Sequence, residues 1–169
     1  LLHFFVEYCK RQGIRVALAP SAFHIRMGMR KLQPIFRNVS LVSMNREEAA
    51  SLTGASYGKE REIFRVFDSV VDGIAVMTQG GKGSLVSDGR YLYRAGIFSG
   101  KKVMDRTGAG DAFGAGFVAG LMMEKDIPYA LRLATANATS IVEAIGAHTG
   151  ALTKQEFANK RWKYLDLDV

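Results

Sequence analysis

The chain has almost no cysteine, since Cys9 is the only thiol among 169 residues. A single cysteine excludes an internal disulfide and is typical of a reducing compartment, so a cytoplasmic protein is expected. Long hydrophobic runs are missing too: the longest, from Ala112 to Met123, is too short to cross a bilayer. No segment reads as a signal peptide, and no membrane partner is expected. The histidines His3, His24 and His148 do not cluster and lack the spacing of a metal site.

Acidic residues are in the minority, with 16 Asp and Glu against 23 Lys and Arg, which gives a formal net charge of +7. A basic chain can bind nucleic acid through its positive field. The basic residues are scattered, however, and the densest group alternates with Met and Leu at helical spacing. That group consists of Arg26, Arg30, Lys31 and Arg37. A solvated helix face explains it better, so no nucleic-acid partner is expected.

Short apolar runs alternate with segments of helical periodicity along the first half of the chain. Strands are predicted over residues 14–19, 39–44 and 73–78, and helices over residues 2–12, 26–37, 46–52 and 59–70, with a kink or a new turn at Pro34. This alternation is typical of parallel βαβ units with helices on both faces of the sheet. The length of 169 residues suits a single α/β domain.

The pattern changes after residue 83. Residues 84–87 and 90–94 flank Asp88 and Gly89, a pair that favours a two-residue type I′ hairpin turn. A further strand is predicted over residues 95–98, and helices are predicted over residues 128–145 and 154–164. The hairpin should add an antiparallel piece to a sheet that is otherwise parallel.

The most informative segment runs from Asp105 to Asp111, a glycine-rich turn that leads directly into an apolar helical segment. The first N–H groups of a helix have no partner within the helix, and the helix dipole adds positive charge there, so such a turn can bind phosphate. Gly108 and Gly110 would let the backbone approach an anion closely. The alternative is that Asp111 is an ordinary helix cap.

Two other phosphate-binding motifs can be excluded in this chain. A P-loop needs G-x-x-x-x-G-K-[ST], but Gly81 and Lys82 are followed by Gly83, and no glycine lies five positions before Gly81. A Rossmann fingerprint needs G-x-G-x-x-G, and the spacing of Gly108, Gly110 and Gly114 is one residue too long.

The same segment resembles the signature D-x-T-G-A-G-D-x-F-x-x-G of the ribokinase-like (PfkB) carbohydrate kinases. The fixed positions are matched by Asp105, Thr107, Gly108, Ala109, Gly110, Asp111, Phe113 and Gly116. The resemblance implies a three-layer α-β-α sandwich with a mostly parallel sheet, and transfer of the γ-phosphate of ATP to a sugar hydroxyl. It also implies that Gly108, Ala109 and Gly110 form an anion hole and that Asp111 is the general base.

Two more segments are similar to motifs of this family. Asn45 and Glu48 match its N-x-x-E segment, which implies that Asn45 contacts phosphate and that Glu48 holds Mg²⁺ through water. Thr78, Gly80 and Gly83 match its T-x-G-x-x-G nucleotide loop. The plain alternatives are a helix cap at Asn45 and an ordinary turn between two strands. All these segments are expected at the carboxyl ends of strands, where ligands bind in open α/β sheets.

The resemblance also bears on the helix predicted after Pro128. Thr135 falls where family members often place a polar residue near the nucleotide, although small residues there also suit simple close packing. Many members bind a monovalent cation, K⁺, and the matching ligands would be Asp105, Thr107 and nearby backbone carbonyls. Gly150 stands where a serine ligand is common and offers no hydroxyl.

The resemblance covers nearly the whole chain but only the C-terminal half of the family. The N-terminal half, with its lid and most contacts to the acceptor, is therefore expected to be absent, and a homodimer would form through that lid in the longer protein. The sequence does not decide whether the phosphate acceptor is a sugar or a nucleoside. A nucleotide-binding fragment without catalysis is the alternative of a different class.

Overall fold

The computed structural model describes residues 1–100, 102–123 and 126–169. These residues form two compact units. The first unit comprises residues 1–79 and 84–92, and the second comprises residues 80–83 and 93–169. No helix in the described ranges combines the length and the apolar character needed to cross a membrane.

The first unit is built on strands β1 (Ala17–Leu18), β2 (Leu41–Asn45), β3 (Ile74–Thr78) and β4 (Ser84–Ser87). β1 pairs with β2, and β2 with β3, in parallel, whereas β3 and β4 are antiparallel. The parallel strands and the antiparallel β4 confirm the predicted α/β pattern. The strand predicted over residues 14–19 is much shorter than expected, because only two of its residues pair with β2.

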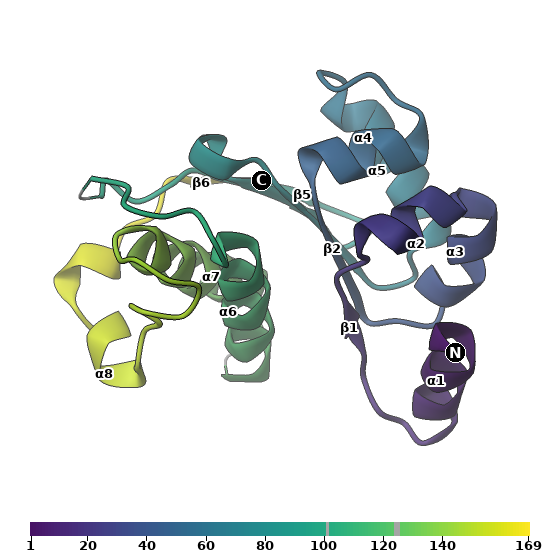
Figure 1. Cartoon of the computed structure of the whole chain (residues 1–169), viewed down its shortest axis with the longest axis horizontal. Coiled ribbons are helices and arrows are strands. Elements are labelled where there is room, and N and C mark those ends of the chain that lie inside the picture. The colour runs from purple at the N-terminus through teal and green to yellow at the C-terminus, as the bar shows by residue number, and fades with distance from the viewer. Residues whose placement is uncertain (101, 124–125) are drawn as a thin grey trace. The chain divides into compact units, whose positions relative to one another are not determined.

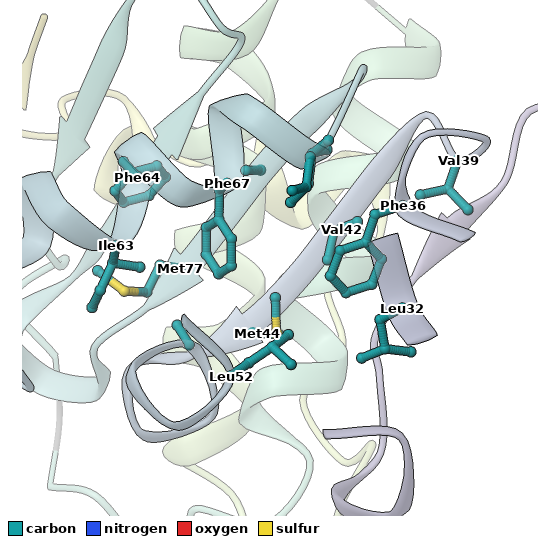
Figure 2. Close-up of a cluster of buried hydrophobic side chains, with 14 of the residues drawn as sticks. Leu32, Phe36, Val39, Val42, Met44, Leu52, Ile63, Phe64, Phe67 and Met77 are labelled. Atoms are coloured by element: carbon teal, nitrogen blue, oxygen red, sulfur yellow. The ribbon is translucent and has the colours of Figure 1, made fainter. Parts of the chain in front are cut away.

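Five helices of the first unit lie on one face of these strands (Figure 1). They are α1 (Leu2–Arg11), α2 (Ala22–Met27), α3 (Met29–Phe36), α4 (Arg46–Thr53) and α5 (Glu60–Val70). In α5 the buried residues Ile63, Phe64 and Phe67 follow helical spacing and pack with Met44 and Met77 of the strands (Figure 2). The hydrophobic side of α5 therefore holds the helix against the sheet.

The opposite face of the strands is apolar as well. Leu41, Val76 and Val86 alternate with the core residues along their strands and are also buried. Burial on both faces is typical of parallel sheets in α/β proteins.

The helix predicted over residues 26–37 is divided at Gly28 instead of at Pro34. Gly28 has φ +80° and ψ 160°, a backbone conformation that interrupts the helical ladder and separates α2 from α3. Pro34 lies inside α3 and does not end it. The prediction was therefore wrong about which residue breaks the helix.

The second unit contains helices α6 (Ala109–Met123) and α7 (Ile127–Val142), which run side by side (Figure 1). A Cβ added at Gly120 would lie 2.5 Å from Ala130 Cα, and one at Gly116 would lie 2.9 Å from Ala134 Cα. The small residues of α6 therefore let its backbone approach that of α7.

Several of the remaining elements differ from the predicted secondary structure. These elements are the 3₁₀ turn η1 (Gly80–Lys82), β5 (Leu92–Ala95), the short α8 (Lys154–Phe157), the 3₁₀ turn η2 (Lys160–Trp162) and β6 (Leu167–Asp168). The helix predicted over residues 154–164 begins as expected but ends at Phe157, and Asn159, which accepts a hydrogen bond from Arg161 N, begins a separate turn. The strand predicted over residues 95–98 was wrong. β5 ends at Ala95, where it pairs with the unpredicted β6.

The turn between β4 and β5 is longer than the predicted two residues. It spans residues 88–91, and the Asp88 carboxylate accepts hydrogen bonds from Arg90 N at 2.9 Å and from Tyr91 N at 2.7 Å. Gly89 has the expected positive φ of 82°. The aspartate therefore shapes this turn through its side chain.

Candidate functional site

The glycine-rich turn leads into the first turn of α6. The first hydrogen bond of the helical ladder runs from Ala112 N to Gly108 O at 2.8 Å, and Ala109 N donates to Arg106 O at 3.3 Å. The N–H groups of Gly110 and Asp111 precede this bond, and neither donates to a backbone oxygen of the described residues. Both residues are exposed, so these two donors are accessible to an anion at the helix N-terminus.

The two glycines of this turn serve different purposes. Gly108 has φ +79°, and a Cβ there would lie 2.3 Å from Ala147 O, so the fold itself requires glycine. A Cβ at Gly110 would meet no atom of the described structure within 4 Å. The open space above Gly110 is where an anion could approach the backbone.

Asp105 holds the turn to the loop that follows α7. Its Oδ1 accepts a hydrogen bond from Thr107 N at 2.9 Å, and its Oδ2 accepts one from Gly146 N at 3.1 Å. The backbone N–H and the side chain of Thr107, followed by the N–H of Gly146, lower the pKa of Asp105 below its usual value. The predicted cation ligands Asp105 and Thr107 thus lie together, and Asp105 is held in its charged form.

Asn137 forms a second link to this turn, and it was not predicted from the sequence. Its Nδ2 donates to Ala112 O and its Oδ1 accepts from Leu152 N, both at 2.9 Å. The amide therefore joins the first turn of α6, the middle of α7 and the segment after Gly150. Its only sequence signal was an amide among the small residues of α7.

Asn45 and Thr78 lie at the carboxyl ends of β2 and β3, where they are register partners. This placement confirms that the two segments meet at the predicted edge of the sheet. Asn45 Oδ1 accepts from Glu48 N at 2.8 Å, and Asn45 N donates to Glu48 Oε2 at 2.9 Å. Asn45 therefore caps α4, which is the plain alternative to a phosphate contact. Asn45 Nδ2 and Glu48 Oε1 have no partner among the residues described.

A buried ion pair supports this edge of the first unit, and no local sequence pattern marks it. Arg46, only 8% exposed, donates from Nε to Tyr57 O at 2.7 Å and lies 3.4 Å from Glu60 Oε1. The same carboxylate oxygen accepts from Gln79 Nε2 at 2.7 Å. The network joins the residues that directly follow Asn45 and Thr78, and so fixes the ends of β2 and β3 to α5.

The predicted nucleotide loop has one open and one crowded glycine. Gly80 has φ +57°, and no described atom lies within 4 Å of a Cβ placed there. Gly83 has φ +87°, and its Cβ would lie 2.0 Å from Ala95 O. Gly83 is therefore required by the close approach of the chain's own backbone.

Thr135 lies in α7 and is 4% exposed. Its hydroxyl has no hydrogen-bond partner among the described residues. The described part of the chain contains no cluster of three or more His, Cys, Asp or Glu side chains that could hold a metal. A cavity of about 420 Å³ in the first unit is lined by α1 and α3, with His3, Lys10 and Arg37 among its residues, and contains none of the predicted site residues.

Comparison with known proteins gives a family match over most of the chain. Residues 2–154 match the pfkB family carbohydrate kinase model. A ribokinase from Haemophilus influenzae is 29% identical over 89% of this chain and 48% of its own length. An uncharacterized sugar kinase from Archaeoglobus fulgidus is 31% identical over 80% of this chain and 52% of its own length. A cytidine kinase from Thermococcus kodakarensis is 32% identical over 68% of this chain and 41% of its own length. The chain spans about half the length of the curated relatives that it matches.

Solved structures share the fold. Arabidopsis thaliana ribokinase, complexed with ribose and ATP, matches with a TM-score of 0.81 and 24% identity over 96% of this chain and 52% of its own. A Methanocaldococcus jannaschii nucleoside kinase matches with a TM-score of 0.78 and 23% identity over 96% of this chain and 53% of its own. These similarities confirm the predicted ribokinase-like α/β fold class.

Proposed function

Because the chain belongs to the pfkB family of carbohydrate kinases, we propose that it supplies the nucleotide-binding and catalytic part of an ATP-dependent sugar kinase. Residues 1–169 would act as one α/β domain in the cytoplasm. The observation that carries the proposal is the first turn of α6, where the N–H groups of Gly110 and Asp111 have no acceptor among the described backbone and a Cβ at Gly110 would have free space. This arrangement supplies donors for a transferring phosphoryl group.

The chemistry requires positioning and charge stabilisation more than covalent help. N–H groups that are fixed before the reaction stabilise the charge that develops on the phosphoryl oxygens. Asp111, as general base, would accept the proton of the attacking hydroxyl. A helix N-terminus favours the ionised carboxylate and makes it a weaker base, so the proton should move late in the reaction.

The edge formed by β2 and β3 supplies the other proposed contacts. Asn45 Nδ2 would donate to a phosphate oxygen, and Glu48 would hold Mg²⁺ through water, an arrangement that suits a cation which keeps several of its waters. Thr78, Gly80 and Gly83 would contact the nucleotide through the loop, and Thr135 through its buried hydroxyl. Asp105 and Thr107, with neighbouring carbonyls, have the oxygen donors that a bound K⁺ would need.

A nucleoside is the second candidate acceptor, favoured by the similarity to a cytidine kinase and to nucleoside kinases. The alternative of a different class is a nucleotide-binding module that performs no transfer. Formation of ADP that depends on an added sugar or nucleoside would separate catalysis from binding alone. A panel of pentoses, hexoses and nucleosides would then separate the two acceptor classes.

The first test is calorimetric titration of Mg·ADP into the purified chain and a Gly110→Leu variant. The new side chain would occupy the open space above residue 110, so we expect affinity to fall by about tenfold or more, equivalent to one charge-assisted hydrogen bond. Gly114→Ala, one turn later in α6, is the control that should bind as the parent does. Equal affinity in the parent and Gly110→Leu would remove the first turn of α6 from the binding site.

The second test concerns the proton transfer. In an acceptor-dependent assay we expect Asp111→Asn to lower kcat by roughly 10²- to 10⁴-fold, the usual contribution of a general base, while Mg·ATP still binds. Asp126→Asn alters an exposed aspartate at the start of α7 and should leave turnover unchanged. Unchanged turnover in Asp111→Asn would contradict the proposed mechanism.

A further inference from the structure

Ser84, the first residue of β4, is 1% exposed, and its hydroxyl has no hydrogen-bond partner among the described residues. A buried hydroxyl without a partner lowers the stability of a folded protein, because the group has lost its hydrogen bonds to water. An alanine would avoid this cost at the same position. The packing of the free protein therefore does not explain why residue 84 is a serine.

The register of the strands places Ser84 beside two residues of the proposed nucleotide site. Asn45 of β2 is the partner of Thr78 of β3, and Thr78 is the partner of Ser84. Register partners project from the same face of a sheet. Asn45, Thr78 and Ser84 thus form a row of three polar residues, which we call the polar row, at the edge where β2 and β3 end.

The neighbouring row has the opposite character. Met44, Met77 and Leu85 are also partners across β2, β3 and β4, and all three belong to the hydrophobic core (Figure 2 shows Met44 and Met77). Because successive residues of a strand alternate between faces, the polar row lies on the face away from that core. Polar side chains at the carboxyl ends of parallel strands are where ligands of open α/β sheets bind.

The other serine of β4 shows that burial alone does not leave a hydroxyl without a partner. Ser87 is 3% exposed, and its Oγ donates to Asp68 Oδ1 at 2.7 Å and accepts from Gly89 N at 3.1 Å. The two serines differ in their partners more than in their exposure. Ser87 is hydrogen-bonded in the free protein, whereas the hydroxyl of Ser84 keeps an unused donor.

We propose that Ser84 is a further ligand-binding residue, whose Oγ donates a hydrogen bond to an anionic oxygen of a bound nucleoside di- or triphosphate. The inference rests on the proposed function and extends it along the polar row. Ser84 would contribute a neutral donor beside Thr78, which separates it from Asn45 in the row.

The test compares Ser84→Ala with Ser87→Ala in two measurements, the urea midpoint of the free protein and calorimetric titration with Mg·ADP. For Ser84→Ala we expect an unchanged or higher midpoint and about tenfold weaker binding, the usual effect of losing a hydrogen bond to a charged group. For Ser87→Ala we expect a lower midpoint, because Asp68 and Gly89 lose their partner, and unchanged affinity.

Three results would overturn the assignment. A lower midpoint for Ser84→Ala would show that the hydroxyl has a partner in the free protein. Unchanged Mg·ADP affinity in Ser84→Ala, with the parent chain binding normally, would remove Ser84 from the site and leave the proposed function in place. Absence of Mg·ADP binding by the folded parent chain would overturn the proposed function and this inference with it.

Discussion

Asp105 connects two segments of the chain that are 41 positions apart. Because both of its oxygens accept backbone hydrogen bonds, one side chain fixes the glycine-rich turn to the loop after α7. The bonds favour the ionised form and lower its pKa in the folded state, chiefly through Thr107. A residue expected only to bind a cation therefore has a structural role as well.

The lowered pKa of Asp105 predicts how stability depends on pH. A carboxyl group whose pKa is lower in the folded state stabilises the protein above its unfolded pKa, usually 3.8, and this contribution is lost as the pH falls through the folded value. We expect the urea midpoint of the parent to fall on acidification in this range, and that of Asp105→Asn to fall less steeply. Asp126→Asn serves as the control and should follow the parent. Parallel acid profiles for the parent and Asp105→Asn would contradict the prediction.

Gly108 and Gly110 show why matching residues to a motif does not reveal what each one does. The sequence treats them alike, but only the three-dimensional contact with Ala147 explains why Gly108 must be glycine. The open space at Gly110 is the feature that suits a ligand. Substitutions at Gly108 would disturb the turn itself, so Gly110 is the position at which binding can be tested.

At the scale of elements, the packing of α6 against α7 predicts that alanine raises the stability of the protein at one glycine of α6 and lowers it at another. Alanine normally stabilises a helix relative to glycine by about 0.5–1 kcal/mol, and Gly114 has open space for a Cβ among the described atoms, so Gly114→Ala should gain about this amount. Gly120→Ala would place a Cβ 2.5 Å from Ala130 Cα, and overpacking should cost about 1–3 kcal/mol. Chemical denaturation of both variants would measure the difference. Stabilisation of both would show that α7 can move away from α6.

The sequence predicts the elements well where local signals are strong. The helix at Arg46 begins with the Asn45 cap and ends at Gly54, whose φ of 73° is left-handed, as the residue types indicate. Predictions failed where two signals competed or where the signal lay elsewhere in the chain. Gly28 broke a helix for which Pro34 was the more obvious cause, and β6 forms only because β5 offers it a partner.

Some parts of the candidate site could likewise be predicted from local sequence signals, and others could not. The turn before α6 and the edge residues Asn45 and Thr78 follow from short motifs, and the structure places them at helix and strand ends as expected. Asn137 and the pair of Arg46 with Glu60 join residues far apart in sequence, and no local pattern marks such partners. The partnerless hydroxyl of Ser84 is likewise visible only in three dimensions.

At the scale of the whole molecule, the count of 23 Lys and Arg residues overstates the number of cations that are free to contact a partner. Several cations are paired with carboxylates in both units. The pairs are Arg11 with Glu7, Arg46 with Glu60, Lys59 with Glu62, and Arg161 with Glu143. Together with the scattered positions of the other basic residues, this pairing argues against a continuous basic surface for nucleic acid.

Salt dependence separates a general basic charge from a specific phosphate site. Duplex DNA releases condensed counterions when a protein binds its phosphates, so weak binding to a basic chain should disappear between about 50 and 200 mM salt. Mg·ADP is a small ligand without such a counterion atmosphere, and we expect its affinity to change by no more than a few-fold over the same range. Fluorescence anisotropy with labelled duplex DNA, beside calorimetry with Mg·ADP, would measure both. Gly110→Leu should weaken only the nucleotide binding, because the substitution leaves the charge of the chain unchanged. Tight DNA binding that persists at the higher salt would instead point to a nucleic-acid partner, since scattered cations alone cannot supply it.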